Sequence, residues 1–550
     1  CLIFLSEKSN VNMRIVQSQL IGSGFFIQKH LTTMVRKTII QKSNQCRACD
    51  ICDINEKRGQ VMKQSSKRNL TMVMDLYELT MANGYFNDGD KTARVAFDVF
   101  YRKNPDRGGF AIFAGLEQIV EYIEDLHFSD EDVEYLRSLN TFTEDFLQYL
   151  RDFKFSGDVY AFPEGTIMYP NEPILTVVAP LIDAQIVETA ILAQVNHQSL
   201  VATKTARIVK AAEGKAVSDF GARRAHNMDA AVYGARASYI GGAAGTATVL
   251  AGQMFGIPVS GTMAHSWVMY YKDEYEAFRH YAENYPDNTV LLVDTYDTIK
   301  SGIPNAIRVA REVLEPMGKR LKGIRIDSGD LAYQSIKVRK MLDDAGLTDC
   351  KIIVSNSLDE HTISSLNMQK ARIDGYGVGE RLITGASSDY SEDSISLLGA
   401  VYKIAAVEEN GGFAPRIKVS GSVEKITNPG LKKVYRVYDQ NGKAKADLIA
   451  KADETIDMSQ EFRFVDPDMP WRNLKFTHCT VRPLQEKIFE NGKLVYKLPT
   501  LNEIRAYVKK QLDEEIWEEE QRFVNPHKHY MDMTPDYYDM KMSLLNDSRM

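Results

Sequence analysis

Residues 257–266 read Ile-Pro-Val-Ser-Gly-Thr-Met-Ala-His-Ser, an apolar stretch that breaks at Gly261 and places His265 in a polar turn. This pattern is typical of a buried strand and its exit loop. Six such strand ends recur between about residue 215 and residue 385, each followed by a polar or charged side chain. Polar side chains collected at the carboxyl ends of parallel strands are how a barrel builds an active site.

The spacing of these strand ends sets the expected fold. It is roughly 25–40 residues, which fits βα units of a parallel barrel or a doubly wound sheet. We predict an irregular parallel α/β barrel over residues 181–400. A second, mixed α+β domain is expected from both chain ends, residues 69–180 and 401–550. The strands expected in the barrel are 216–218, 257–260, 290–293, 323–326, 352–354 and 376–378.

Helical periodicity is clearest outside the barrel strands. Residues 69–83 carry apolar side chains at helical spacing and meet Gly84, where this helix is predicted to end. Residues 130–150 read as one helix with an acidic first turn. Residues 183–212 form a long helical pattern without internal Gly or Pro.

Composition narrows the class of protein. The 550 residues are 44% hydrophobic and 26% charged, which is usual for a soluble globular protein with more than one domain. The net charge of −7 does not favour nucleic acid. No apolar run approaches the ~18 residues of a membrane helix, so no membrane partner is expected. The isolated Cys350 and Cys479 suit a reducing, cytoplasmic location.

Residues 1–68 differ from the rest and are expected to be a non-native or disordered leader, with Met62 as a plausible start. Cys46, Cys49 and Cys52 form a C-x-x-C-x-x-C cluster. A zinc or iron–sulfur site would need a fourth ligand, and none follows nearby. A chance cluster is the favoured interpretation.

Several strand ends carry groups that bind anions. Arginines follow or lie within strands, glycines let the backbone approach a ligand, and a hydroxyl follows within one turn. Together they are candidates for a phosphate cradle, although each alone fits an ordinary salt bridge or turn. The candidates are Arg223, Arg224, Arg325, Gly375, Gly377, Gly379 and Thr384.

Carboxylates, a histidine and aromatic rings complete the candidate set. Asp327 and Asp330 flank a Ser-Gly pair and could bind ribose hydroxyls directly or through Mg²⁺, unless Asp330 caps a helix. His265 could be a general base, a metal ligand or a phosphoryl acceptor; the metal role is least favoured because no His or Cys partner has ligand spacing. Phe220 and Tyr77 could stack a planar substrate or simply belong to the core.

These residues occur in five motifs in order. They are residues 74–81 (MDLYELTM), 219–225 (DFGARRA), 261–266 (GTMAHS), 324–331 (IRIDSGDL) and 354–356 (VSN). From about Asn69 to at least Asn525, the chain resembles the nicotinate phosphoribosyltransferase family. The resemblance implies the type II phosphoribosyltransferase architecture and a homodimer with shared active sites. It also implies formation of nicotinate mononucleotide and pyrophosphate from nicotinate and phosphoribosyl pyrophosphate, in NAD salvage. ATP as co-substrate and Mg²⁺ or Mn²⁺ are implied as well.

The resemblance also implies residue roles. His265 would be phosphorylated, and Phe220 would sandwich the pyridine ring with Tyr77 of the partner subunit. Nicotinate and nearby phosphate would be held by Thr262, Arg223 and Arg325. The ribose phosphate would face Asp327, Asn356, Gly377 and Gly379, with Thr384 close by. Glu380 departs from the family, which commonly has a small hydroxyl residue there; a carboxylate would repel phosphate unless Arg381 or Mg²⁺ intervenes.

Two alternatives stay open. Nicotinamide phosphoribosyltransferases resemble this family but place an Asp in a Gly-Thr-rich segment, whereas residues 242–249 contain no carboxylate. This favours the acid as substrate. A catalytically silent scaffold would be expected to lack the histidine or the strand-end arginines, and both are present.

Overall fold

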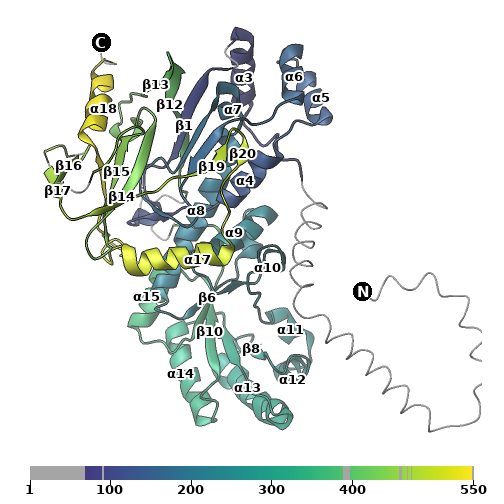
Figure 1. The fold of residues 1–550 in the computed structure, drawn as a ribbon. Helices are drawn as coiled ribbons and strands as arrows, with labels where there is room; N and C mark the ends of the chain where they lie inside the picture. The colour runs from purple at the N-terminus through teal and green to yellow at the C-terminus, as the bar shows by residue number, and fades with distance from the viewer. Residues whose placement is uncertain are drawn as a thin grey trace, which may run out of the picture. The chain divides into compact units, whose positions relative to one another are not determined.

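A computed structural model describes residues 68–89, 92–387, 397–457, 461–467, 469–471 and 473–547. All the elements named below belong to one compact unit, Leu70–Met550 (Figure 1). The predicted leader, with its cysteine cluster and Met62, lies outside the described residues except for Arg68. Along the described part of the chain, no helix is both long enough and apolar enough to cross a membrane.

A six-stranded parallel sheet forms the lower half of Figure 1. Its strands carry apolar side chains that are fully buried, among them Ile324, Ile326, Ile352, Val354 and Val378. Parallel strands need crossovers, and helices follow most of these strands. In spatial order the strands are β7 (Gly245–Thr246), β6 (Ala216–Asp219), β11 (Gly375–Val378), β10 (Lys351–Ser355), β9 (Gly323–Ile326) and β8 (Val290–Leu292).

The predicted strand 257–260 is reduced to a single bridge, between Val259 and Thr246 of β7. Pro258 has no N–H to donate, although its carbonyl accepts from the Thr246 N–H at 3.0 Å. Within the described ranges no strand pairing joins β8 to this segment, so backbone hydrogen bonds do not close a barrel. Side chains do meet across the gap, because Arg325 Nη1 lies 3.1 Å from Thr262 Oγ1.

A seven-stranded antiparallel sheet draws its strands from both parts of the chain. Its strand β1 pairs with β5 on one side and with β12, more than 300 residues later, on the other. This agrees with the expected domain built from both chain ends. The order is β13 (Gly412–Pro415), β12 (Val401–Glu409), β1 (Arg94–Phe100), β5 (Leu175–Pro180), β3 (Asp158–Ala161), β19 (Glu486–Glu490) and β20 (Lys493–Leu494).

A second six-stranded sheet comes from the C-terminal third of the chain. Arg436 and Asp447, both fully buried, form a bidentate ion pair between two of its strands. The order is β17 (Asn473–Phe476), β16 (Phe462–Val465), β21 (Tyr530–Met533), β15 (Ala444–Lys451), β14 (Lys432–Tyr438) and β18 (Thr480–Pro483). Helix α18 (Pro535–Asp547) packs against β15 and β16.

Helix α8 (Glu188–Ala211) joins the two largest hydrophobic cores. Its first turns, with Ile191 and Val195, pack into the core of the antiparallel sheet. Its last turns, with Val201 and Ile208, pack into the core of the parallel sheet. The helical pattern predicted over residues 183–212 is divided at Val187 between α7 (Leu181–Ile186) and α8. Helix α8 is buried on nearly all sides, and several of its buried residues are polar or charged, so it has no distinct polar face.

Two other predicted helices also have the wrong bounds. The first helix, α3, spans Leu76–Asp88 and passes through Gly84. It ends instead at Gly89, whose φ of 90° provides the left-handed cap that glycine adopts without strain. The helix predicted over residues 130–150 is two helices, α5 (Asp130–Ser138) and α6 (Glu144–Arg151), because Asn140 turns left-handed between them.

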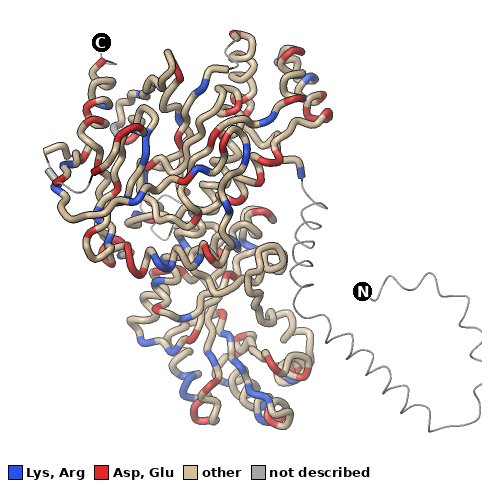
Figure 2. The backbone as a smooth tube through the Cα atoms, in the orientation of Figure 1, with Lys and Arg blue, Asp and Glu red and all other residues tan. Residues whose placement is uncertain are grey.

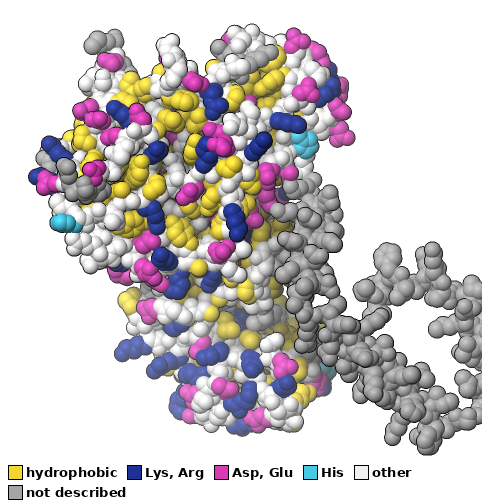
Figure 3. All heavy atoms as spheres, viewed as in Figure 1, with side chains coloured by type: hydrophobic (Ala, Val, Ile, Leu, Met, Phe, Trp, Pro, Cys, Tyr) yellow, Lys and Arg dark blue, Asp and Glu magenta, His cyan; other side chains and the backbone are white. Residues whose placement is uncertain are grey.

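Charged residues of both signs are spread along the described chain (Figure 2). On the face drawn in Figure 3, Lys and Arg gather over the lower, parallel part, among acidic residues. Arginines of the parallel part pair with acidic neighbours, as in Arg308–Glu312, Arg320–Asp349 and Arg339–Asp343. Such paired, solvated charges do not form the basic footprint that nucleic acid requires.

Candidate active site

The candidate site lies at the carboxyl ends of the parallel strands. Strands β6, β9, β10 and β11 pair in parallel, so their exit loops meet at one edge of the sheet. Most of the predicted residues are in these loops or in the turn that carries His265. Tyr77, in α3, is the exception.

Arg325, Asp327 and Ser355 form a closed hydrogen-bonded triangle. Arg325 donates from Nη2 to Asp327 Oδ1 at 2.9 Å and from Nε to Ser355 Oγ at 2.8 Å. The Ser355 hydroxyl in turn donates to Asp327 Oδ1. Burial raises the pKa of the Asp327 carboxyl, but the hydrogen bonds from Ser355 and Arg325 and the nearby His265 outweigh it and hold that pKa below its usual value.

His265 reaches the other oxygen of the same carboxylate. It is the first residue of α11 (His265–Tyr270), and its Nε2 lies 3.7 Å from Asp327 Oδ2. Its Nδ1 lies 3.1 Å from Thr295 Oγ1. The side chain is 40% exposed, so a ligand at the mouth of the site can reach it. The imidazole and the Arg325 guanidinium therefore share one carboxylate, although 60 residues separate them.

Phe220 provides an aromatic face beside this cluster. The Arg325 guanidinium carbon lies 5.4 Å from the centre of the Phe220 ring. The ring packs over Gly377, where an added Cβ would lie 2.5 Å from Phe220 Cδ2. Buried Asp219 fixes the turn, accepting from the Gly221 N–H at 2.8 Å and from Thr246 Oγ1 at 2.7 Å. In the described structure, Gly377 thus makes room for a side chain; a close backbone approach to a ligand is not needed to explain it.

The remaining strand-end candidates are mostly exposed. Arg223 lies in a short turn, Ala222–Arg224, on the surface. Asn356 has a φ of 97°, a left-handed conformation that Asn tolerates better than most residues, and it is exposed at the end of β10.

The loop after β11 forms one short helical turn. Gly379 precedes α16 (Glu380–Ile383), and the Thr384 hydroxyl donates to the Glu380 carbonyl at 2.7 Å. The Glu380 side chain is exposed. Arg381 Nη1 donates to the Ser387 carbonyl oxygen at 2.6 Å.

Tyr77 is the one predicted site residue that lies apart. It is 43% exposed on α3, at the top of Figure 1, whereas the parallel strands lie in the lower half. Partial burial and a hydrogen bond with Glu188 raise the pKa of its hydroxyl. Tyr77 therefore does not face Phe220 within one chain.

Known proteins match this chain along nearly its whole described length. Models of the nicotinate phosphoribosyltransferase family match residues 215–442, and those of its N-terminal and C-terminal domains match residues 72–196 and 431–541. A nicotinate phosphoribosyltransferase of Bacillus subtilis is 46% identical over 482 residues, 87% of this chain and 96% of that protein. The chain belongs to the nicotinate phosphoribosyltransferase family.

Other members of the nicotinate phosphoribosyltransferase family are similar at lower identity. One from Dictyostelium discoideum is 34% identical over 87% of this chain and 88% of its own length. The crystal structure of human nicotinic acid phosphoribosyltransferase superposes with a TM-score of 0.75 at 29% identity, covering 86% of this chain and 99% of that one. The resemblance seen in the five motifs is therefore confirmed.

The family site contains groups that the sequence did not single out. Asp294 lies just after β8, and its Oδ2 accepts from the Asp327 N–H at 2.9 Å and from Ser328 Oγ at 2.5 Å. Its Oδ1 is buried and has no hydrogen-bond partner among the described residues. Thr295 and Ser355 were also passed over as individual residues. Only their position after a strand distinguishes such residues in the sequence.

The carboxylates of this site suit a magnesium ion. Two carboxylate oxygens could serve as hard ligands: Asp294 Oδ1, which has no hydrogen-bond partner among the described residues, and Asp327 Oδ2, which faces His265. Mg²⁺ prefers one or two carboxylates plus phosphate oxygens and water. Asp330 fits less well, because its Oδ1 accepts from the Tyr333 N–H at 3.0 Å and caps α14 (Leu331–Asp344). Over the described ranges, no group of three or more His, Cys, Asp or Glu residues has metal-site geometry.

Proposed function

We propose that this chain transfers the phosphoribosyl group of phosphoribosyl pyrophosphate to nicotinate, with coupled hydrolysis of ATP, as the entry step of NAD salvage. The products are nicotinate mononucleotide and pyrophosphate. One observation carries the assignment: His265, at the start of α11, and Arg325, in β9, contact the same carboxylate of Asp327 at the ends of parallel strands. The sequence similarity to nicotinate phosphoribosyltransferases supports the same reaction.

The chemistry requires charge stabilisation more than a base. When the bond from ribose C1 to pyrophosphate breaks, the sugar gains oxocarbenium character and the leaving group carries negative charge. The pyridine nitrogen of nicotinate is already nucleophilic and bonds to C1 without losing a proton. We assign Arg325 and Arg223 to binding nicotinate and the nearby phosphate. Asn356, Gly379 and Thr384 are assigned to binding the ribose phosphate.

An acidic substrate fits the charge of this site. Arg325 is only 11% exposed, and its Nη1 contacts Thr262 Oγ1, so a carboxylate at Thr262 would meet a fixed guanidinium. The ring would lie on Phe220. The segment 242–249 contains β7, which pairs with the end of β6, and it brings no carboxylate that would repel an acid. These features favour nicotinate over nicotinamide.

Asp294 and Asp327 would hold Mg²⁺ in this site. When bound, Mg²⁺ supplies positive charge that stabilises the pyrophosphate leaving group. Glu380 is exposed at the edge of the site and is not assigned to the metal in this scheme. Its charge is expected to weaken phosphate binding there.

His265 is the proposed phosphoryl acceptor. A ring nitrogen attacks the γ-phosphorus of ATP, the bond to the ADP oxygen breaks, and ADP leaves. Water later cleaves the phosphohistidine and releases inorganic phosphate. While present, the phosphoryl group adds negative charge and acceptor oxygens beside Asp327, which reorganises substrate binding around Arg325.

We propose a homodimer in which the partner subunit's Tyr77 completes the ring sandwich. The α3 surface supports this, because Val73, Leu76, Tyr77 and Met81 are all at least 39% exposed. Near the site, Val249 and Met254 of α10 (Val249–Phe255) are also exposed and apolar.

The curled parallel sheet would act as an irregular open barrel.

A cytoplasmic location is proposed as well. Cys350 and Cys479 are unpaired and buried, as expected for thiols in a reducing compartment.

The test is mass detection of the mononucleotide formed by the purified full chain. Nicotinate with phosphoribosyl pyrophosphate and Mg²⁺ should yield nicotinate mononucleotide, faster with ATP than without. Nicotinamide in equal amount should neither react nor compete strongly. Product from nicotinamide alone would reassign the substrate, and no product from either would leave the chain as a binding protein.

A further inference from the structure

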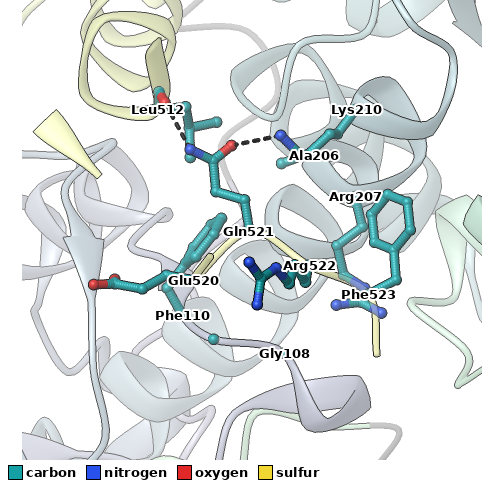
Figure 4. Close-up of a pocket in the computed structure, with 11 residues that line it drawn as sticks. Gly108, Phe110, Ala206, Arg207, Lys210, Leu512, Glu520, Gln521, Arg522 and Phe523 are labelled. Carbon is teal, nitrogen blue, oxygen red and sulfur yellow. Dashed lines mark hydrogen bonds between the residues drawn. The ribbon is translucent and has the colours of Figure 1, made fainter. Parts of the chain in front are cut away.

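A small cavity lies between the second half of α8 and the segment 518–523 (Figure 4). It shares no residue with the candidate active site. Its lining includes three cationic side chains, from Arg207, Lys210 and Arg522, and the bare backbone of Gly108. The enclosed space is ≈ 20 Å³. About 10–15 Å³ is enough for one water, so the cavity admits a small polar group but not a whole organic molecule.

Arg207 is the buried cation of this cavity. Its side chain is 8% exposed, and its Nε donates to Glu360 Oε1 at 2.9 Å. Its Nη2 is buried and has no hydrogen-bond partner within the described part of the chain. The Phe523 ring covers one face of the guanidinium at 5.3 Å. A buried N–H without an acceptor is costly, so an acceptor atom entering the cavity would be stabilised.

The glycine wall keeps this guanidinium accessible. A Cβ built on Gly108 would lie 3.1 Å from Arg207 Nη1, so any side chain there would crowd the group. Figure 4 shows the Arg522 guanidinium on the same side of the cavity as Gly108. Arg207, Arg522 and Gly108 thus line the same cavity.

The neighbouring carboxylates are occupied elsewhere or exposed. Glu520 turns away from the cavity in Figure 4, and its Oε2 accepts from the Tyr169 hydroxyl at 2.7 Å. Arg522 is 3.7 Å from Glu519, with both side chains about half exposed. Lys210 pairs with Glu518, whose side chain is 75% exposed. Such surface pairs are weak and leave the two cations available to a ligand.

We propose that this cavity binds a phosphate group. Arg207 and Arg522 would donate to its oxygens, because guanidinium forks match phosphate geometry, and Lys210 would add charge at the rim. The leading oxygens enter the enclosed space, and the rest of the group stays at the surface beside Arg522. The phosphate is either inorganic phosphate or the terminal phosphate of a nucleotide.

The test is equilibrium dialysis of ³²P-labelled inorganic phosphate against the full chain. Wild type should bind phosphate in a class of sites that Arg522→Ala weakens about tenfold, the size expected for one lost charge-assisted hydrogen bond. The same class should persist in Arg325→Lys, which alters only the strand-end site. The matched control is Arg320→Ala, since Arg320 is an exposed arginine paired with Asp349 on another surface.

Because Arg522 is exposed, its replacement should leave the fold intact, and a thermal melt checks this. ADP added as a competitor distinguishes the two sources: displacement of phosphate from this class identifies a nucleotide site, and no displacement identifies an inorganic phosphate site. An isotherm of Arg522→Ala that coincides with that of wild type would overturn the proposal.

Discussion

Replacing Arg325 by lysine tests how the site recognises an acid. Arg325 uses Nε, Nη1 and Nη2 on three different partners, at 2.8, 3.1 and 2.9 Å. Lysine keeps one positive charge but cannot hold Ser355, Thr262 and Asp327 at once. In Arg325→Lys the carboxylate of the substrate and the Asp327 carboxylate therefore compete for a single ammonium group.

The expected loss follows from these contacts. A hydrogen bond to a charged group contributes about 1.5–3 kcal/mol, so losing one that strengthens in the transition state lowers kcat/KM by roughly 10- to 150-fold. We predict a value near the middle of that range for nicotinate. The fold should persist, because the side chain fits the same space and keeps its charge.

The assay is initial-rate kinetics with nicotinate and phosphoribosyl pyrophosphate varied separately, alongside a thermal melt. Arg320→Lys is the matched control, because Arg320 precedes the other end of β9 and pairs with exposed Asp349. That control should stay within twofold of wild type. If Arg325→Lys also kept wild-type kcat/KM with an unchanged melt, the assignment of Arg325 would be refuted.

Three further predictions concern packing, metal and pH. Gly377→Ala should raise the KM for nicotinate, because the new Cβ would lie 2.5 Å from Phe220 Cδ2 and displace the ring. Gly84→Ala is the control and should leave the KM unchanged, because there is open space around Gly84. Asp294→Asn should raise the Mg²⁺ concentration for half-maximal rate by about tenfold, since the unpartnered oxygen loses its charge. Burial raises the pKa of the Glu78 carboxyl from 4.5 to about 7. The contribution of Glu78 to folding stability is therefore full below about pH 4.5 and is lost as the pH rises through about 7. In Glu78→Gln the melting midpoint should depend less on pH over this range.

Each of these predictions has a contradicting outcome. An unchanged nicotinate KM in Gly377→Ala would mean that Phe220 does not support the ring. An unchanged Mg²⁺ requirement in Asp294→Asn would place the metal elsewhere. A melting midpoint that falls equally with pH in Glu78→Gln and wild type would assign the effect to other groups.

The strand ends could be predicted because local patterns determine them. Buried apolar runs that stop at Gly, Asp or Asn gave five of the six parallel strands, β6, β8, β9, β10 and β11, to within about two residues. The sixth strand of the observed sheet, β7, was not predicted. The strand predicted at residues 257–260 keeps its exit loop and His265 but forms only one bridge, because Pro258 has no N–H to donate. Curvature and closure of a sheet depend on long-range packing, which periodicity does not encode.

The contacts within the site were harder to predict. Asp294 and Ser355 act through Asp327, and such partners come together only when β8, β9 and β10 are aligned. Gly377 gave a correct signal of close approach, but the partner is the Phe220 ring. The boundary at Gly84 was wrong because a glycine inside a helix costs only about 1 kcal/mol, which tertiary packing of α3 offsets.

The most direct test of the account is to follow the γ-phosphoryl group of labelled ATP on the purified chain. We expect acid-labile label on the peptide that contains His265, and its discharge as phosphate when nicotinate and phosphoribosyl pyrophosphate are added. His265→Ala should carry no label and lose the stimulation by ATP. Label on a different residue, or ATP stimulation that survives in His265→Ala, would contradict a reaction centred on the strand ends around Asp327.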